Sequence, residues 1–181
     1  DLEKISFEEL NKFEKEKFLP LFFLVQILDE FSLKNLKFSK SEISKIKMGD
    51  ASDFTNFMTA VIDQRAFDKI SGYIDRAKSR DTCKVICGGG YDDSIGWFIE
   101  PTIIQTTNPT SESMVEEIFG PVLTVYVYDD SDFDQVLTMC DEGSQYALTG
   151  SIFSSSEENI QKAYNALRFT AGNFYINDKP T

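Results

Sequence analysis

The amino-acid sequence predicts an α/β fold in which a partly parallel sheet is flanked by helices. Three observations predict this class. The composition is that of a globular protein, because 41% of the 181 residues are hydrophobic and 27% are charged. From residue 61 onward, strand-like segments alternate with amphipathic helical segments. The links between them are short, and this order is typical of βαβ units with parallel strands.

The first part of the chain differs in composition from the rest. Every Gly and every Arg lies beyond residue 48, and residues 1–49 carry as many bases as acids, so the net charge of −12 arises from residues 50–181. Such a break indicates a domain boundary or a segment of different origin. We therefore expect a helical segment of unrecognised origin at residues 1–41 and a separate unit at residues 42–181.

Residues 1–41 show a structural pattern without catalytic chemistry. Apolar residues, among them Leu2, Ile5 and Leu10, lie at roughly helical spacing, and Lys and Glu occupy the other face. This pattern predicts an amphipathic helix with one solvated face and one apolar face that packs on a core. The apolar run at 18–28 is too short to span a bilayer. We expect a buried helix or a pair of strands there.

The next elements are predicted in chain order. An amphipathic helix covers 61–80, and a short apolar strand at 84–90 is stopped by three glycines. The strand-like segment 96–107 is interrupted by Pro101, which predicts an edge strand or a bulge. β-Branched and aromatic residues predict a strand at 121–130.

Two helices and two strands complete the predicted fold. Ser131 and Ser156 stand where a hydroxyl oxygen caps the first turn of a helix, and Gly143 stands just past the end of the first of them. The ranges are 131–143 and 156–168 for the helices, and 148–156 and 171–178 for the strands.

The composition excludes several classes of function. A chain with a pI of about 4.4 lacks the basic surface that nucleic acids require, and anionic membranes would repel it, so we expect neither as a partner. The absence of His excludes Ser-His-Asp and Cys-His catalysis and His-ligated zinc. Three Cys form no dense disulfide framework, which favours a reducing compartment.

Three further motifs favour structural interpretations. The glycines at 88–90 follow a strand but match neither the dinucleotide fingerprint nor the P-loop, so a plain turn is predicted. Cys83, Cys87 and Cys140 have the spacing and neighbours of ordinary free thiols, and we expect no metal site. The paired carboxylates adjoin turns and helix starts, where solvated acids are common.

The segment from Met114 to Pro121 carries the strongest functional pattern. Two acids are followed by an apolar pair, a Gly-Pro punctuation and a buried strand. If the segment is extended, Glu117 and Phe119 point the same way. A carboxylate accepts hydrogen bonds from vicinal hydroxyls such as those of a ribose, and an aromatic ring beside it can cover a second ring. Spacing alone leaves a structural role open as well.

The run EEIFGPVLTVY at 116–126 resembles a motif of the aldehyde dehydrogenase superfamily. Four further segments resemble successive parts of that family's catalytic domain, in order: GDASDFTNFMTAVID, GGGYDDSIGWFIEPTII, YALTGSIFS and AGNFYINDK. Within the superfamily, these segments most resemble the sequences of the delta-1-pyrroline-5-carboxylate (glutamate-semialdehyde) dehydrogenase branch. The resemblance covers residues 42–181 and implies the fold of the aldehyde dehydrogenase catalytic domain.

This resemblance implies an NAD-dependent oxidation of an aldehyde to a carboxylate, with L-glutamate gamma-semialdehyde of proline catabolism as substrate. In the family a Cys thiolate attacks the aldehyde, hydride passes to the nicotinamide, and a Glu-activated water releases the acid. By the same resemblance Glu117 binds the nicotinamide ribose hydroxyls and Phe119 flanks the nicotinamide. A homo-oligomer in the complete enzyme and a mitochondrial matrix location are implied too.

The sequence also departs from the family pattern. By the resemblance we expect the family nucleophile near residues 18–21 of this chain, where there is no Cys, and we expect the amino-terminal Rossmann half to be absent. We therefore expect no catalytic residue in this chain and no activity from it alone. Two alternatives stay open: an inactive interaction module derived from the fold, and a truncated gene product.

Overall fold

The computed structural model describes residues 26–28 and 42–178. The helix expected near the amino terminus, and most of the apolar run at 18–28, lie outside the described residues. The last three residues of that run form a strand.

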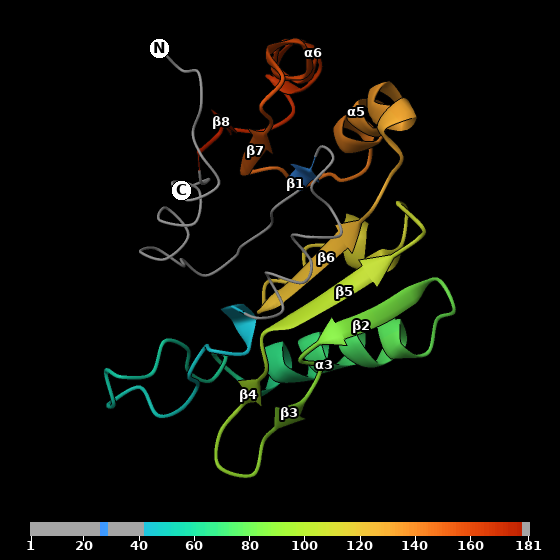
Figure 1. Ribbon diagram of the computed structural model, residues 1–181. Helices are drawn as coiled ribbons and strands as arrows, with labels where there is room; N and C mark the ends of the chain where they lie inside the picture. The colour runs from blue at the N-terminus through green and yellow to red at the C-terminus, as the bar shows by residue number, and fades with distance from the viewer. Residues whose placement is uncertain (1–25, 29–41, 179–181) are drawn as a thin grey trace.

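The described elements alternate as the sequence predicts (Figure 1). The helical elements are α3 (Gln64–Lys78), α4 (Glu112–Val115), the 3-10 turn η1 (Asp130–Asp132), α5 (Phe133–Glu142) and α6 (Glu157–Leu167). The strands are β1 (Gln26–Leu28), β2 (Cys83–Cys87), β3 (Tyr91–Asp92), β4 (Phe98–Ile99), β5 (Thr102–Thr106), β6 (Val122–Tyr126), β7 (Thr149–Phe153) and β8 (Asn173–Ile176).

The strands form two three-stranded sheets and a short ladder. One sheet has the order β2-β5-β6, with β5 antiparallel to β2 and parallel to β6. The other has the order β1-β7-β8 and is parallel throughout. The strands β3 and β4 pair antiparallel. The predicted α/β class with a partly parallel sheet is therefore confirmed.

Helix α3 covers the β2-β5-β6 sheet (Figure 1). It begins at Asp63, whose carboxylate accepts a hydrogen bond from the Ala66 backbone N–H at 2.8 Å. Its apolar side chains recur at helical spacing and enter the core with residues of β4 and the segment before β6. The members of this core, which we call the α3 core, are Phe67, Ile70, Ile74, Ile99 and Ile118.

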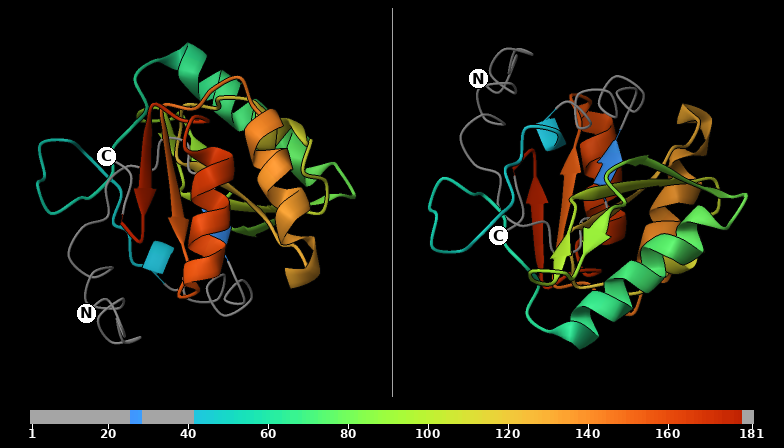
Figure 2. Two further views of the ribbon diagram at one scale, coloured as in Figure 1. Left: turned by 90° about the horizontal axis from the view of Figure 1, so that it is seen from above. Right: turned by 90° about the horizontal axis from the view of Figure 1, so that it is seen from below.

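A second core lies between β7 and the pair α5 and α6, which lie side by side on the strand (Figure 2). Ser156 caps α6, as predicted, by accepting a hydrogen bond from the Asn159 backbone N–H at 3.3 Å. The buried members are Phe133, Leu137, Ile152, Ala163 and Leu167. Within the two described ranges, none of the helices is both long enough and apolar enough to traverse a bilayer.

One local prediction was wrong, and another was right only in part. Ser131 does not cap α5, because the chain enters that helix through η1, and the cap position falls on Asp132 without a side-chain hydrogen bond. Pro101 does interrupt the segment 96–107, and the strand before it, β4, pairs only with β3 among the described strands, but the strand after it, β5, is central in its sheet. Pro101 precedes the first paired residue, Thr102, so the ladder requires no N–H from it. The irregularity occurs in β2, where the register shifts between Val85 and Cys87.

Candidate functional site

The two predicted site residues lie in an irregular segment, residues 116–121, between α4 and β6. Ile118 is only 5% exposed and anchors the segment in the α3 core. Glu117 is half-buried on one side of this anchor, and Phe119 is 65% exposed on the other. A large aromatic ring is thus exposed at the surface two residues after a half-buried acidic residue.

The backbone of this segment is not extended. Phe119 has a φ of 61°, in the left-handed region that bulky side chains rarely adopt. The condition under which strand alternation would point Glu117 and Phe119 the same way, an extended segment, is therefore not met at Phe119. The chain turns because the Val122 N–H donates to the Gly120 carbonyl at 2.7 Å, immediately before β6. A left-handed non-glycine residue costs about 1–3 kcal/mol, and such residues cluster at functional sites.

Contacts with α3 hold this segment in place. The Lys69 Nζ donates to the Glu117 backbone carbonyl at 2.8 Å. Gly120 packs so closely on the helix that an added Cβ would lie 2.5 Å from the Ile70 Cδ1. The close approach therefore favours glycine at this position, because any larger residue would force the buried Ile70 side chain to shift.

The Glu117 carboxylate has no hydrogen-bond or ion-pair partner among the described residues, whereas the nearby Glu112 is fully engaged. The Glu112 carboxylate accepts hydrogen bonds from the guanidinium groups of Arg76, at 3.0 and 3.1 Å, and of Arg80, at 2.9 Å. An ionised carboxylate offers only acceptor positions. Glu117 can therefore receive hydroxyl donors of a ligand, and the adjacent exposed ring of Phe119 can cover a planar group.

The glycine run forms the turn that was predicted. Gly88 and Gly89 have φ values of 67° and 87°. The Gly89 N–H donates to the Thr102 hydroxyl, and the Gly90 N–H donates to the Glu100 carboxylate, each at 2.9 Å. These amides are occupied within the protein, and a carboxylate stands where a phosphate would have to bind. The turn is therefore structural.

The cysteines do not lie in the Glu117 segment. Cys83 and Cys87 stand at the two ends of β2, Cys140 lies in α5, and all three are free thiols. Burial raises the pKa of the Cys140 thiol to about 11, so that thiol is protonated at neutral pH and is a weak nucleophile. In the part of the chain that the structure describes, no three His, Cys, Asp or Glu side chains are grouped to hold a metal ion.

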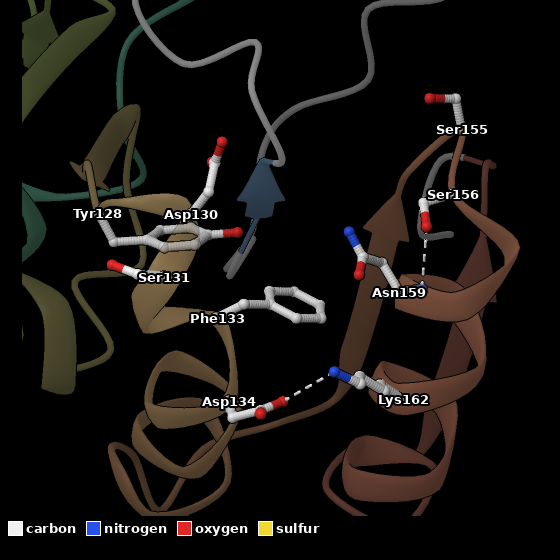
Figure 3. Close-up of a pocket in the computed structure, with 9 residues that line it drawn as sticks. All are labelled: Tyr128, Asp130, Ser131, Phe133, Asp134, Ser155, Ser156, Asn159 and Lys162. Carbon is white, nitrogen blue, oxygen red and sulfur yellow. Dashed lines mark hydrogen bonds and ion pairs between the residues drawn. The ribbon is translucent and has the colours of Figure 1, made fainter.

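A separate pocket of about 480 Å³ opens between the start of α5 and the start of α6 (Figure 3). Its lining includes Asp134 and Lys162, which face each other across it at 3.7 Å, and Lys162 also pairs with Glu158. Ser131 and Ser156 also line the pocket, although they were predicted only as helix caps. This pocket was not predicted, and its one lysine is already neutralised by acids.

The chain belongs to the aldehyde dehydrogenase family, whose model matches residues 24–181. Among its relatives are the mitochondrial delta-1-pyrroline-5-carboxylate dehydrogenases of Dictyostelium discoideum, 53% identical over 139 residues, and of Homo sapiens, 46% identical over 141 residues. Each alignment covers 77% of this chain and 25% of the relative. The chain therefore spans about a quarter of the length of these curated relatives.

The fold is similar to that of a solved enzyme. The crystal structure of the delta-pyrroline-5-carboxylate dehydrogenase from Mycobacterium tuberculosis bound with NAD matches with a TM-score of 0.77 and 39% sequence identity. The match covers 87% of this chain and 28% of that one. The family match begins at residue 24, upstream of the boundary expected at residue 42, and β1 within it pairs with β7. The division of the chain at residue 42 stays a prediction.

Proposed function

We propose that this chain forms part of the catalytic domain of an NAD-dependent aldehyde dehydrogenase that oxidises L-glutamate gamma-semialdehyde to glutamate. Membership of the aldehyde dehydrogenase family supports the reaction class. The names of the relatives, at 53% and 46% identity, support the substrate. The similar structure from Mycobacterium tuberculosis, which is bound with NAD, supports the cofactor.

One observation carries the assignment of the site: the Glu117 carboxylate is half-buried and without a partner among the described residues, and an exposed aromatic residue, Phe119, follows two positions later. Glu117 would accept hydrogen bonds from the two ribose hydroxyls on the nicotinamide side of NAD. Phe119 would cover the nicotinamide ring and keep water from that face. When bound, NAD supplies the acceptor for the hydride that leaves the aldehyde.

The chain supplies binding and orientation, not the nucleophile. Cys83, Cys87 and Cys140 lie away from the Glu117 segment in the sequence and on other elements of the fold. The position that the family nucleophile would occupy, near residues 18–21, holds no Cys. We therefore propose that the chain is inactive by itself and acts only within a complete catalytic site.

We also propose a mitochondrial matrix location and a homo-oligomer for the complete enzyme. The mitochondrial names of the relatives support the location. Several apolar side chains support an assembly because they are largely exposed: Phe54, Ile62, Ile95, Leu148 and Phe169. Fractionation of mitochondria tests the location, and sedimentation of the complete enzyme tests the assembly. A cytosolic protein, or a monomer, would contradict the respective proposal.

The role of Glu117 is testable in a chimera in which residues 42–178 replace the matching segment of the Dictyostelium discoideum relative. Glu117→Ala should lower kcat/KM for NAD by the loss of charged hydrogen bonds, about 1–3 kcal/mol, or roughly fivefold to 150-fold. The matched control is Glu116→Ala, because Glu116 has the same charge in the same segment but is exposed. It should change kcat/KM less than about twofold.

Steady-state kinetics with varied NAD and saturating aldehyde measure the effect. Equal kcat/KM values in the Glu117→Ala chimera and the unmodified chimera would remove Glu117 from the cofactor site. Equal losses in the Glu116 and Glu117 variants would attribute the effect to the charge of the segment and not to a bond with ribose.

A further inference from the structure

The segment that carries Glu117 is attached to one helix at three levels. Before the segment, the carboxylate of Glu112 on α4 pairs at 2.9 Å with Arg76 of α3 and at 2.9 Å with Arg80, which lies two residues past the end of that helix. After it, Gly120 rests on the Ile70 side chain. Between these two levels, the ammonium group of Lys69 on α3 donates a hydrogen bond to the backbone carbonyl of Glu117. The helix itself is fixed by its own buried side chains, so it provides a rigid base.

Lys69 differs from the other two attachments because it contacts the site residue itself. Its ammonium donates to the carbonyl of Glu117, which lies two residues before the left-handed Phe119. The two residues that form the bond are 48 positions apart in the sequence. A bond at this point fixes the peptide plane after Glu117 and opposes relaxation of Phe119 to an ordinary backbone conformation, which the cost of the left-handed region would otherwise favour.

We propose that Lys69 is a positioning residue that fixes the direction of the Glu117 side chain and the left-handed backbone at Phe119. This inference rests on the proposed function for its consequence, because Glu117 and Phe119 matter to ribose and nicotinamide only if they bind the cofactor. Its structural part, the control of the Phe119 backbone by Lys69, stands on the geometry alone. Lys69 therefore acts through Glu117 and Phe119 and needs no contact with the cofactor.

The test uses the full 181-residue chain labelled with 15N and 13C, and three variants. Lys69→Met keeps an apolar stem but removes the donor, Lys69→Arg keeps a donor, and Lys84→Met is the matched control. Lys84 is an exposed lysine on β2 without a hydrogen bond or ion pair among the described residues. The first measurement is the set of backbone carbon shifts at Phe119, which report its φ and ψ, together with amide exchange at Ile118 and Gly120.

We expect Lys69→Met to move the Phe119 shifts toward extended values and to accelerate amide exchange at Ile118 and Gly120 by roughly tenfold, the factor set by about 1.4 kcal/mol of local opening. Lys69→Arg should restore both quantities, and Lys84→Met should leave them unchanged. A role limited to general stability would lower the melting temperature without a shift change confined to this segment. Unchanged Phe119 shifts in Lys69→Met would overturn the proposal.

A second measurement separates this inference from the proposed function. Nicotinamide mononucleotide is titrated into each protein, and the amide shifts of residues 117–120 are followed. Positioning by Lys69 predicts that Lys69→Met weakens the response roughly tenfold. If Glu117→Gln leaves the response unchanged, or if the parent chain gives no response, the ribose assignment fails, while the Phe119 shifts still decide the role of Lys69. If Glu117→Gln abolishes the response and Lys69→Met matches the parent, the assignment survives and the inference fails.

Discussion

The purified 181-residue chain should produce no NADH from L-glutamate gamma-semialdehyde and NAD, whereas the chimera that carries residues 42–178 within the Dictyostelium discoideum relative should turn over. The expected difference is complete, because enzymes accelerate reactions by at least about a millionfold and we propose that the nucleophile's position in this chain, near residues 18–21, holds no Cys. The measurement is the absorbance of NADH over hours, at high protein concentration, against a blank without protein.

The chimera is the matched control because it contains the same described segment together with the upstream region of a relative. Its activity would show that residues 42–178 are compatible with catalysis and that the missing function lies elsewhere. Turnover by the isolated chain above the blank would contradict the prediction. If iodoacetamide abolished that turnover, one of the three cysteines would be its source. Cys140 would be the least suitable of them, since its raised pKa keeps the thiol protonated.

Replacement of Ile70 by alanine should give the largest loss of stability. Ile70 is 1% exposed in the α3 core and also supports Gly120, so truncation removes a packed side chain and the surface on which the site segment rests. Deletion of a fully buried Ile side chain costs about 2–5 kcal/mol in the free energy of unfolding. Urea unfolding followed by circular dichroism measures this loss.

Ile62→Ala provides the matched control for this measurement. Ile62 is 88% exposed, so the same truncation removes almost no packing, and we expect a change within about 0.5 kcal/mol. A loss below about 1 kcal/mol in Ile70→Ala would mean that the α3 core is not packed as described. An equal loss in both variants would lead to the same conclusion.

Local sequence patterns predicted an element correctly where its own residues are enough to determine its structure. The helix α3 follows from apolar side chains at helical spacing, and α6 follows from Ser156 ahead of two acids. Ser131 has the same local chemistry but no capping role, because η1 shifts the start of α5. The central place of β5 was not predictable either. The neighbours of a strand are set by pairing with segments far away in the sequence, and a local residue such as Pro101 carries no information about that pairing.

Glu117 and Phe119 were proposed as site residues from the sequence, and this role stays a prediction, whereas the geometry of their segment was not predicted. The motif around Glu117 and Phe119 can be recognised from a few consecutive residues. The resemblance to the family then implied that these two residues bind the cofactor. The left-handed backbone at Phe119 and the bond from Lys69 depend on packing between α3 and a segment 48 residues away. One sequence signal was available: Gly120 precedes a proline where the chain meets α3, and the close contact with Ile70 explains the glycine.

The central claim is that the Glu117 carboxylate binds the ribose beside the nicotinamide. The crystal structure of the chimera with NAD bound tests it most directly. We expect both hydroxyls of that ribose to donate to the Glu117 carboxylate, at roughly 2.6–3.0 Å, with the Phe119 ring against the nicotinamide. A structure in which NAD is bound while Glu117 faces solvent, or is ion-paired away from the ribose, would contradict the claim.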